Sequence, residues 1–123
     1  MSNQDTFKKG YVELLVLALL REGDLYGYQL SQLVKERSEN VLTIPEGSMY
    51  PTLYRLTDKG YISDEKRLIG KRLTRTYYHL EPKGRDYLDA LLNSFYTVNK
   101  AIERVLNYDA AEQCKNTEGD SNE

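Results

Sequence analysis

The sequence predicts a mainly α-helical fold with one small β-hairpin, and three observations support this prediction. Apolar residues recur with helical spacing in four segments, of which the last, residues 82–106, is by far the longest. Residues 61–67 and 74–80 have the composition of strands and flank a basic stretch that contains a glycine. The helical segment just before them carries an extended polar face. This order of elements is typical of a winged helix-turn-helix followed by a long C-terminal helix.

Composition indicates an ordinary globular protein with a single core. Of the 123 residues, 40% are hydrophobic and 29% are charged. The longest apolar run, residues 14–20, is much shorter than the roughly 20 residues that span a bilayer, and no signal-peptide pattern surrounds it. We therefore expect a cytoplasmic protein that does not enter the membrane. Its one cysteine, Cys114, excludes an intramolecular disulfide.

The first half of the chain predicts two helices and a very short strand. The first helix is expected over residues 6–21, with Thr6 as its cap and Gly23 as its end. Its buried side is expected to consist of Val12, Leu15, Val16, Leu19 and Leu20. A second helix is expected over residues 26–37, and the apolar run at residues 41–44 is predicted to be a minimal strand.

The third predicted helix begins at residue 47 or 48 and ends at residue 59. Met49, Leu53 and Leu56 repeat at i, i+4 and i+7 and so form one apolar stripe. Ser48 is the expected cap, because Pro51 is tolerated best in the first turn. Gly60 provides a left-handed stop. The remaining face is polar, aromatic and cationic, and we assign to it Ser48, Tyr50, Thr52, Tyr54, Arg55 and Lys59.

The predicted hairpin has Gly70 at its tip and a concentration of positive charge around it. Residues 66–75 contain five cations and no acid: Lys66, Arg67, Lys71, Arg72 and Arg75. The net charge of the chain is nevertheless −2, because acidic residues dominate residues 109–123. We expect that C-terminal segment to be a disordered acidic tail. A nearly neutral protein with a basic hairpin is compatible with nucleic-acid binding.

The long fourth helix carries a seam of apolar residues with heptad-type spacing. Its members are Leu88, Leu91, Phe95, Val98, Ile102 and Val105. A seam of this length extends far beyond a small helical core, so a second copy of the chain is the expected partner. The sequence therefore predicts a winged helix-turn-helix domain at residues 1–80, a dimerisation helix at 81–108 and the tail at 109–123.

Specific residues also resemble the PadR family of bacterial transcriptional regulators. The similarity covers about residues 10–106 and includes residues 14–20, 26–28, 47–56, 59–62 and 75–80. Its most specific part is the Tyr-Pro-x-Leu-x-x-Leu pattern at residues 50–56, followed by the Tyr-Tyr pair in the second strand. The single C-terminal helix is similar to that of the smaller subfamily. Tyr26 departs from the pattern, since the family usually has His there.

The resemblance implies a function as well as a fold. It implies a homodimeric repressor that binds double-stranded DNA at an inverted-repeat operator with ATGT and ACAT half-sites. It also implies release from DNA by a small aromatic or hydrophobic effector. Some members stack flat ligands on a tryptophan of the dimer helix, and this chain has no tryptophan. That absence argues against a sensor of planar drugs.

The candidate DNA contacts come from three elements. The third helix would enter the major groove, while tyrosines at the start of the second helix and cations at the hairpin tip would contact phosphates or the minor groove. The assigned residues are Tyr26, Tyr28, Ser48, Tyr50, Thr52, Tyr54, Arg55, Lys71 and Arg72. The alternatives are that the tyrosines simply pack and that the charged hairpin tip is only a solvated loop.

A candidate effector cavity would lie between helices at the dimer axis. The residues expected to line it are Leu15, Leu88, Leu92, Phe95 and Tyr96, which could equally form plain dimer core. Catalysis has little support, because the chain has a single histidine, His79, and a single cysteine. We expect no enzyme activity, no metal and no cofactor. The alternative function is a winged-helix protein–protein interaction module without sequence-specific DNA binding, although the basic hairpin favours the repressor.

Overall fold

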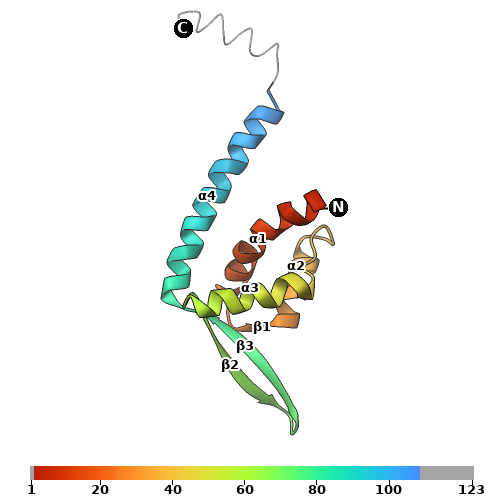
Figure 1. Cartoon of the computed structure of the whole chain (residues 1–123), viewed down its shortest axis with the longest axis vertical. Coiled ribbons are helices and arrows are strands. Elements are labelled where there is room, and N and C mark those ends of the chain that lie inside the picture. The colour runs from red at the N-terminus through yellow and green to blue at the C-terminus, as the bar shows by residue number, and fades with distance from the viewer. Residues whose placement is uncertain (1, 109–123) are drawn as a thin grey trace, which may run out of the picture. The chain divides into compact units, whose positions relative to one another are not determined.

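The computed structural model describes residues 2–108, with side chains from residue 11 onward, and confirms the predicted fold class. The elements follow in the order α1 (Ser2–Leu20), β1 (Leu25–Tyr26), α2 (Gly27–Arg37), α3 (Glu46–Asp58), β2 (Ile62–Ile69), β3 (Leu73–Leu80) and α4 (Pro82–Leu106) (Figure 1). The fold is mostly helical with a small antiparallel sheet. The predicted acidic tail, including Cys114, lies outside the described residues.

The described chain forms two compact units. The first extends to Leu91 and contains α1 to α3, the sheet and the first turns of α4, and the second begins at Leu92 and contains the rest of α4. Gly84 and Leu88 of α4 are buried in the first unit. This unit therefore reaches past residue 80, where the sequence suggested a domain boundary.

The core of the first unit forms where α1 packs against α2 and α3. Met49, Leu53 and Leu56 are fully buried, which confirms the predicted apolar stripe of α3. α1 contributes Val16 and Leu17, which are also fully buried. The remaining buried apolar residues are Val12, Leu14, Leu19, Leu20, Leu30, Val34, Ile44, Ile62, Leu80 and Leu88. Burial of this apolar surface is what holds the helices of the unit together.

Both helices with predicted caps begin earlier than expected. α1 starts at Ser2, so Thr6 lies inside it. α3 starts at Glu46 with Pro45 as its N-cap, and the Ser48 N–H donates to the Pro45 carbonyl at 2.9 Å. Ser48 is therefore not the cap, and Pro51 lies in the second turn. Because proline has no N–H, the carbonyl four residues earlier lacks its usual helical partner.

The sheet contains a strand that the sequence analysis did not predict. β1 pairs antiparallel with β3 through Leu25↔Tyr78 and Tyr26↔Tyr77, which gives the strand order β1-β3-β2. A strand of two residues is too short to show the alternation of apolar and polar residues by which strands are predicted. The minimal strand predicted at residues 41–44 is wrong, because the Leu42 N–H donates to the Ser38 hydroxyl at 2.9 Å and that segment is a loop.

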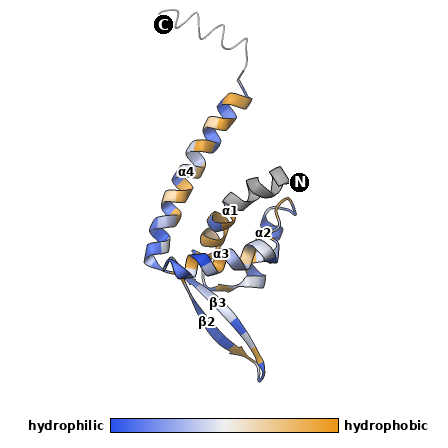
Figure 2. Ribbon diagram, in the orientation of Figure 1, coloured by the Kyte–Doolittle hydropathy of each residue, from blue (hydrophilic) through white to orange (hydrophobic). Residues whose placement is uncertain are grey.

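The hairpin and α4 agree closely with the prediction. β2 and β3 pair from Ile62↔Leu80 to Ile69↔Leu73, and Gly70 adopts a φ of 70° in the turn between them. α4 begins at Pro82 and ends at Leu106, as predicted. Figure 2 shows hydrophobic residues distributed along α4 among hydrophilic ones. Within residues 2–108, no helix combines the length and the apolar character needed to cross a membrane.

Candidate nucleic-acid interface

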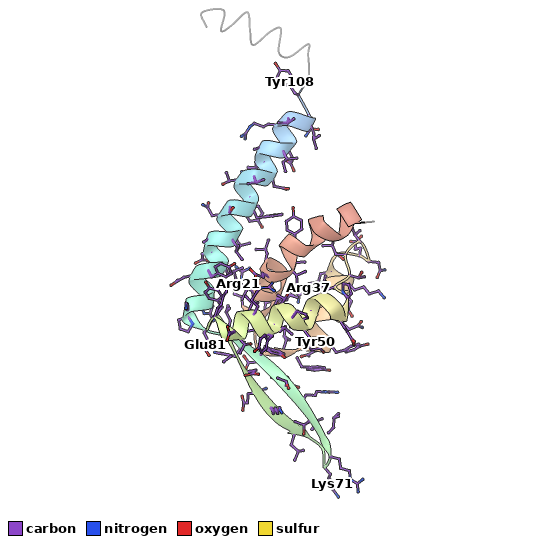
Figure 3. All side chains as sticks on the ribbon, viewed as in Figure 1. Arg21, Arg37, Tyr50, Lys71, Glu81 and Tyr108 are labelled. Carbon is purple, nitrogen blue, oxygen red and sulfur yellow. The ribbon has the colours of Figure 1, made fainter. Side chains whose placement is uncertain are left out.

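Exposed tyrosines from two helices form the most distinctive surface of the first unit. Tyr50 and Tyr54 of α3 are 46% and 76% exposed, and Tyr28 of α2 is 63% exposed. Large aromatic rings are normally turned inward when a core is available. Tyr50 is labelled on α3 in Figure 3, and Tyr50 and Tyr54 are exposed on the polar face that the sequence analysis assigned to this helix. Their exposure leaves both ring surface and hydroxyl groups accessible to a ligand.

Two open hollows separate these tyrosines from β3. Each has a volume of about 630 Å³, and Tyr50 and Tyr78 contribute to the walls of both. The first hollow is lined by Tyr26, Gly27, Tyr28, Tyr50, Thr74, Arg75, Thr76 and Tyr78. The second is lined by Tyr50, Tyr54, Thr57, Asp58, Asp64 and Tyr78. The two hollows together follow the line where α2, α3 and the hairpin meet.

The two hollows differ in charge. The first contains Arg75 and several hydroxyl groups and no acid, whereas the second contains the carboxylates of Asp58 and Asp64. Burial, the charge of Asp64 and the neighbouring Tyr50 raise the pKa of Tyr78, so its phenol stays protonated and can donate a hydrogen bond. A phosphate group is therefore accommodated better by the first hollow than by the second.

Thr74, Thr76 and Tyr78 are residues of the first hollow that the sequence analysis did not assign to any site. They occupy alternate positions of β3, and alternate residues of a strand lie on the same face of a sheet. The recurrence of hydroxyl-bearing residues at every second position could therefore have predicted a polar face on β3. The Tyr50 ring packs closely over Gly27: a Cβ at that position would lie 2.5 Å from the Tyr50 hydroxyl, so a larger residue would displace the ring.

Tyr26 and two of the hairpin cations hold one another in place. The Arg75 guanidinium lies 4.3 Å from the centre of the Tyr26 ring, and the Arg67 guanidinium lies 4.3 Å from that of Tyr77. The two rings meet edge to face at 5.3 Å. Tyr26 is half-buried by these contacts. Arg75 thus braces the hairpin, and Arg67 does the same.

Asp24 anchors the hairpin at the start of β1. Its carboxylate accepts a hydrogen bond from the Arg67 guanidinium at 2.9 Å and lies 2.8 Å from Nδ1 of His79. The hydrogen bond with His79 is the main reason that the pKa of Asp24 is lowered, with a further contribution from Arg67. His79 therefore makes a structural contact between β3 and the residue that precedes β1.

The cations of the hairpin differ in how exposed their side chains are. Lys66, Lys71 and Arg72 are all exposed, whereas Arg67 and Arg75 make the contacts described above. Figure 3 shows Lys71 at the far end of the hairpin from the helices. The predicted basic tip is therefore present, with both of its assigned residues, Lys71 and Arg72, open to solvent.

Three assigned residues of α3 occupy different environments from those predicted. Thr52 is only 5% exposed, so the prediction that it lies on the open face is wrong. It is three residues after Met49 and four before Leu56, which places it on the buried side of the helix. Ser48 is half-buried and does not cap the helix. Arg55 is half-exposed but forms an ion pair with Glu13 of α1 at 3.1 Å.

The residues assigned to the seam of α4 divide between the two units. Leu88 is 1% exposed and belongs to the core of the first unit, so it cannot lie on a surface that a second chain covers. Val98, Ile102 and Val105 are all exposed in the second unit, whereas Leu91 and Phe95 are half-buried. Of the residues assigned to the effector cavity, Leu15 and Leu92 are half-buried and Tyr96 is exposed.

Comparison with known proteins identifies the family of the chain. Residues 16–90 match the transcriptional regulator PadR-like family. The chain belongs to the PadR-like family. Its members are transcriptional regulators, so membership confirms the expectation that the chain is not an enzyme. The family resemblance that the sequence analysis drew from residues 50–56 and the Tyr-Tyr strand is confirmed as well.

Two curated relatives differ in how much of their length they share with this chain. An uncharacterised protein from Lysinibacillus sphaericus is 30% identical over 95 residues, which cover 77% of this chain and 87% of that protein. The negative transcriptional regulator PadR of Bacillus subtilis is 33% identical over 73 residues, which cover 59% of this chain and 40% of that protein. The chain thus matches less than half the length of Bacillus subtilis PadR.

Solved structures of PadR-like proteins share the fold. A transcriptional regulator from Clostridium thermocellum has a TM-score of 0.74 at 32% identity, with 81% of this chain and 96% of that chain covered. Bacillus subtilis PadR in complex with operator DNA has a TM-score of 0.61 at 31% identity, with 65% of this chain and 45% of that chain covered. The second of these neighbours was therefore solved with DNA bound.

Proposed function

We propose that this PadR-like protein is a homodimeric repressor that binds an inverted-repeat operator through α3 and the β2–β3 hairpin. One observation carries the proposal: the exposed tyrosines of α3 lie beside a hairpin that exposes Lys66 within β2 and Lys71 and Arg72 at its tip. An α-helix fits the major groove, and cations on an adjacent hairpin can follow the phosphate backbone. The similarity to Bacillus subtilis PadR, whose structure contains operator DNA, supports the same proposal.

The charge of the two hollows suggests how the DNA backbone would lie. The hollow with Arg75 and the hydroxyl groups of Tyr26, Tyr28 and Thr76 suits a phosphate, whereas Asp58 and Asp64 would repel one from the other hollow. We therefore place the phosphates on the side of α2 and the base contacts on the side of Tyr50 and Tyr54. Thr52 has no part in this proposal, because it is buried.

The homodimer and the effector are further parts of the proposal. Val98, Ile102 and Val105 expose apolar surface on the second unit, and a second copy of α4 would cover it. Two copies of α3 related by a two-fold axis would read two half-sites about one helical turn apart. A small aromatic effector would bind near Leu92, Phe95 and Tyr96 and release the repressor from DNA. A protein with this partner would act in the cytoplasm.

Replacing Tyr54 with alanine is expected to weaken operator binding more than binding to random DNA. Tyr54 is the most exposed tyrosine of α3, and loss of a base contact costs about 1–3 kcal/mol at the matching sequence only. The measurement is a competitive titration at one salt concentration, with a duplex that carries the ATGT and ACAT inverted repeat and a scrambled duplex of equal length. Tyr108→Ala, which removes another exposed tyrosine, serves as the matched control.

The same titration separates the proposed repressor from the alternative of a protein–protein interaction module. A repressor prefers the inverted repeat, and Tyr54→Ala reduces that preference, while Tyr108→Ala leaves it unchanged. An interaction module shows no preference between the two duplexes in the wild-type chain. A Tyr54→Ala variant with the wild-type ratio of affinities would remove α3 from the proposed reading role.

Replacing Lys71 and Arg72 together with alanine is expected to weaken binding to operator and random DNA about equally. Each phosphate contact contributes a slope of about −0.9 to the dependence of log K on log salt, so the double variant should flatten that slope by up to about two units per subunit. The measurement is DNA affinity at several salt concentrations. Arg21→Ala with Lys35→Ala removes the same charge outside the hairpin and should change the slope less. An unchanged slope in the Lys71 and Arg72 variant would place the hairpin tip away from DNA.

A further inference from the structure

One acidic side chain joins three helices of the first unit. Glu13 of α1 accepts a hydrogen bond from the Arg55 side chain of α3, with 3.1 Å between Nε and Oε2. Its other oxygen, Oε1, accepts a hydrogen bond from the Tyr87 hydroxyl of α4 at 2.7 Å. The two partners lie 42 and 74 residues away in the sequence. Glu13 thus connects α3 directly to the first turns of α4.

The cluster is shielded from solvent more than an ordinary surface ion pair. The Glu13 side chain is only 21% exposed, compared with 47% for Arg55. Two bonds to one partly buried carboxylate fix its orientation, because each oxygen has its own donor. The Arg37–Glu22 pair also uses both carboxylate oxygens, but its side chains are both more than half exposed and it joins only two residues.

Stacked rings hold the Tyr87 end of the cluster in place. The Tyr87 ring lies parallel to the Tyr61 ring, with 4.2 Å between their centres and an angle of 5° between their planes. Lys83 of α4 also contacts Tyr61: its Nζ lies 5.3 Å from the centre of the Tyr61 ring. The same Nζ donates a hydrogen bond to the Lys59 carbonyl at 2.9 Å. The end of α3 and the start of α4 therefore share a second set of contacts beside Glu13.

The protonation state of Tyr87 also reflects its bond to Glu13. That hydrogen bond, followed by burial and the charge of Glu13, raises the pKa of Tyr87 to about 12. Ionisation of the phenol would place a second negative charge beside the carboxylate, so the neutral form is favoured. The contribution of this bond to stability is complete below the unfolded tyrosine pKa of about 10 and is lost as the pH rises through the folded value.

Arg55 is poorly arranged to read a base while it contacts Glu13. A guanine edge is recognised by two guanidinium N–H groups at once, at O6 and N7. In the structure both Nε and Nη2 of Arg55 lie 3.1 Å from Oε2 of Glu13, on the side of α1. Thr52 Oγ1, at 3.5 Å from Nη2, lies on the buried side of α3 as well. The Nε and Nη2 edge of the guanidinium therefore faces Glu13, while 47% of the Arg55 side chain stays exposed.

We infer that Glu13 is a positioning residue for DNA binding, which fixes α3 against the start of α4 through Arg55 and Tyr87, and that Arg55 serves this contact and does not read a base. The inference rests on the proposed function, because it assumes that α3 binds DNA. It makes Tyr50 and Tyr54 the base-reading residues of α3. It also makes the first turns of α4 a part of the DNA-binding apparatus.

The test measures how the Glu13→Gln variant changes DNA affinity. A purely electrostatic effect of Glu13 and a positioning role of Glu13 predict different results. Removal of an acid from a DNA-binding protein, with release of an arginine, should by simple electrostatics tighten binding or leave it unchanged. If Glu13 positions α3, the inverted-repeat duplex should instead bind about threefold to tenfold more weakly, because two charge-assisted bonds are weakened. Glu46→Gln, which removes the same charge from the exposed first turn of α3, is the matched control and should not weaken binding.

Two further variants identify the contact that matters. Tyr87→Phe removes only the hydroxyl and keeps the ring that stacks on Tyr61, so it should fold and still weaken operator binding. The double variant Glu13→Gln with Tyr87→Phe should lose less than the sum of the two single effects, because both act on the same link. Arg55→Ala should lower affinity for every single-base variant of the operator by the same factor, whereas loss of a base reader relaxes discrimination at one position.

A spectroscopic measurement reports on the cluster without DNA. In protein labelled at the tyrosine Cζ carbon, the Tyr87 signal should titrate near pH 12 in the wild type and closer to pH 10 in Glu13→Gln. If the Tyr87 titration moves but Glu13→Gln binds the operator as tightly as the wild type, the positioning role is excluded and only the proposed function stands. If the wild-type chain shows no preference for the operator, the proposed function fails and this inference fails with it.

Discussion

Replacing Gly84 with alanine is expected to destabilise the first unit by about 2–4 kcal/mol. A Cβ on Gly84 would lie 2.0 Å from the Tyr61 carbonyl oxygen and 2.8 Å from Cδ1 of Leu80. The obstructing oxygen belongs to the backbone and also accepts a hydrogen bond from the Glu81 N–H at 3.0 Å, so it cannot move without breaking the start of α4. A closely packed core accommodates such a clash only by shifting the backbone.

Urea unfolding followed by circular dichroism measures this effect. Gly47→Ala is the matched control, because nothing lies within 4 Å of a Cβ at that position and alanine favours a helix over glycine. The control should change the unfolding free energy by no more than about 1 kcal/mol, in the stabilising direction. Equal stabilities for the two variants would show that α4 does not start against Tyr61 in solution.

Replacing Val98 with aspartate is expected to weaken the proposed homodimer by at least about a hundredfold. Val98 is 53% exposed in the single chain, so the variant should fold, but a seam between two copies of α4 would bury the new charge twice. An unpaired buried charge costs several kcal/mol, and 1.4 kcal/mol corresponds to a factor of ten. Leu91 is less suitable for this test, because it is already half-buried and lies in the first unit.

Analytical ultracentrifugation over a range of protein concentrations measures the dimer. Asn93→Asp introduces the same charge at an exposed position outside the seam and should leave the dissociation constant nearly unchanged. Operator affinity should fall together with the dimer, because a single α3 reads only one half-site. A wild-type chain that remains monomeric at micromolar concentration would exclude the dimer and, with it, recognition of an inverted repeat.

Local patterns were sufficient to predict most of the elements. The stripe of Met49, Leu53 and Leu56 predicted α3, the glycine at residue 70 predicted the hairpin turn, and Pro82 predicted the start of α4. Each of these signals is contained within a few residues, where backbone preferences and hydrophobic periodicity decide the structure. The burial of Thr52 could also have been predicted, because its spacing from Met49 and Leu56 is that of a buried position.

Contacts between distant segments could not be predicted in this way. β1 exists because Leu25 and Tyr26 find a partner in β3, and two residues carry no pattern of their own. Arg55 was expected to face DNA, and only the folded chain shows Glu13 beside it. Leu88 fits the heptad spacing of α4, but it is buried in the core of the first unit. In each case the tertiary environment overrides a reasonable local assignment.

The strand order β1-β3-β2 also bears on how this protein avoids aggregation. Within the described residues β2 pairs only with β3, so the other side of this eight-residue strand presents backbone groups that could template a further strand. Asp64, Glu65 and Lys66 are exposed in the middle of β2. Charged side chains at an edge strand discourage edge-to-edge pairing between molecules. The long hairpin can therefore extend from the helices (Figure 1) without becoming a site of sheet-like self-association.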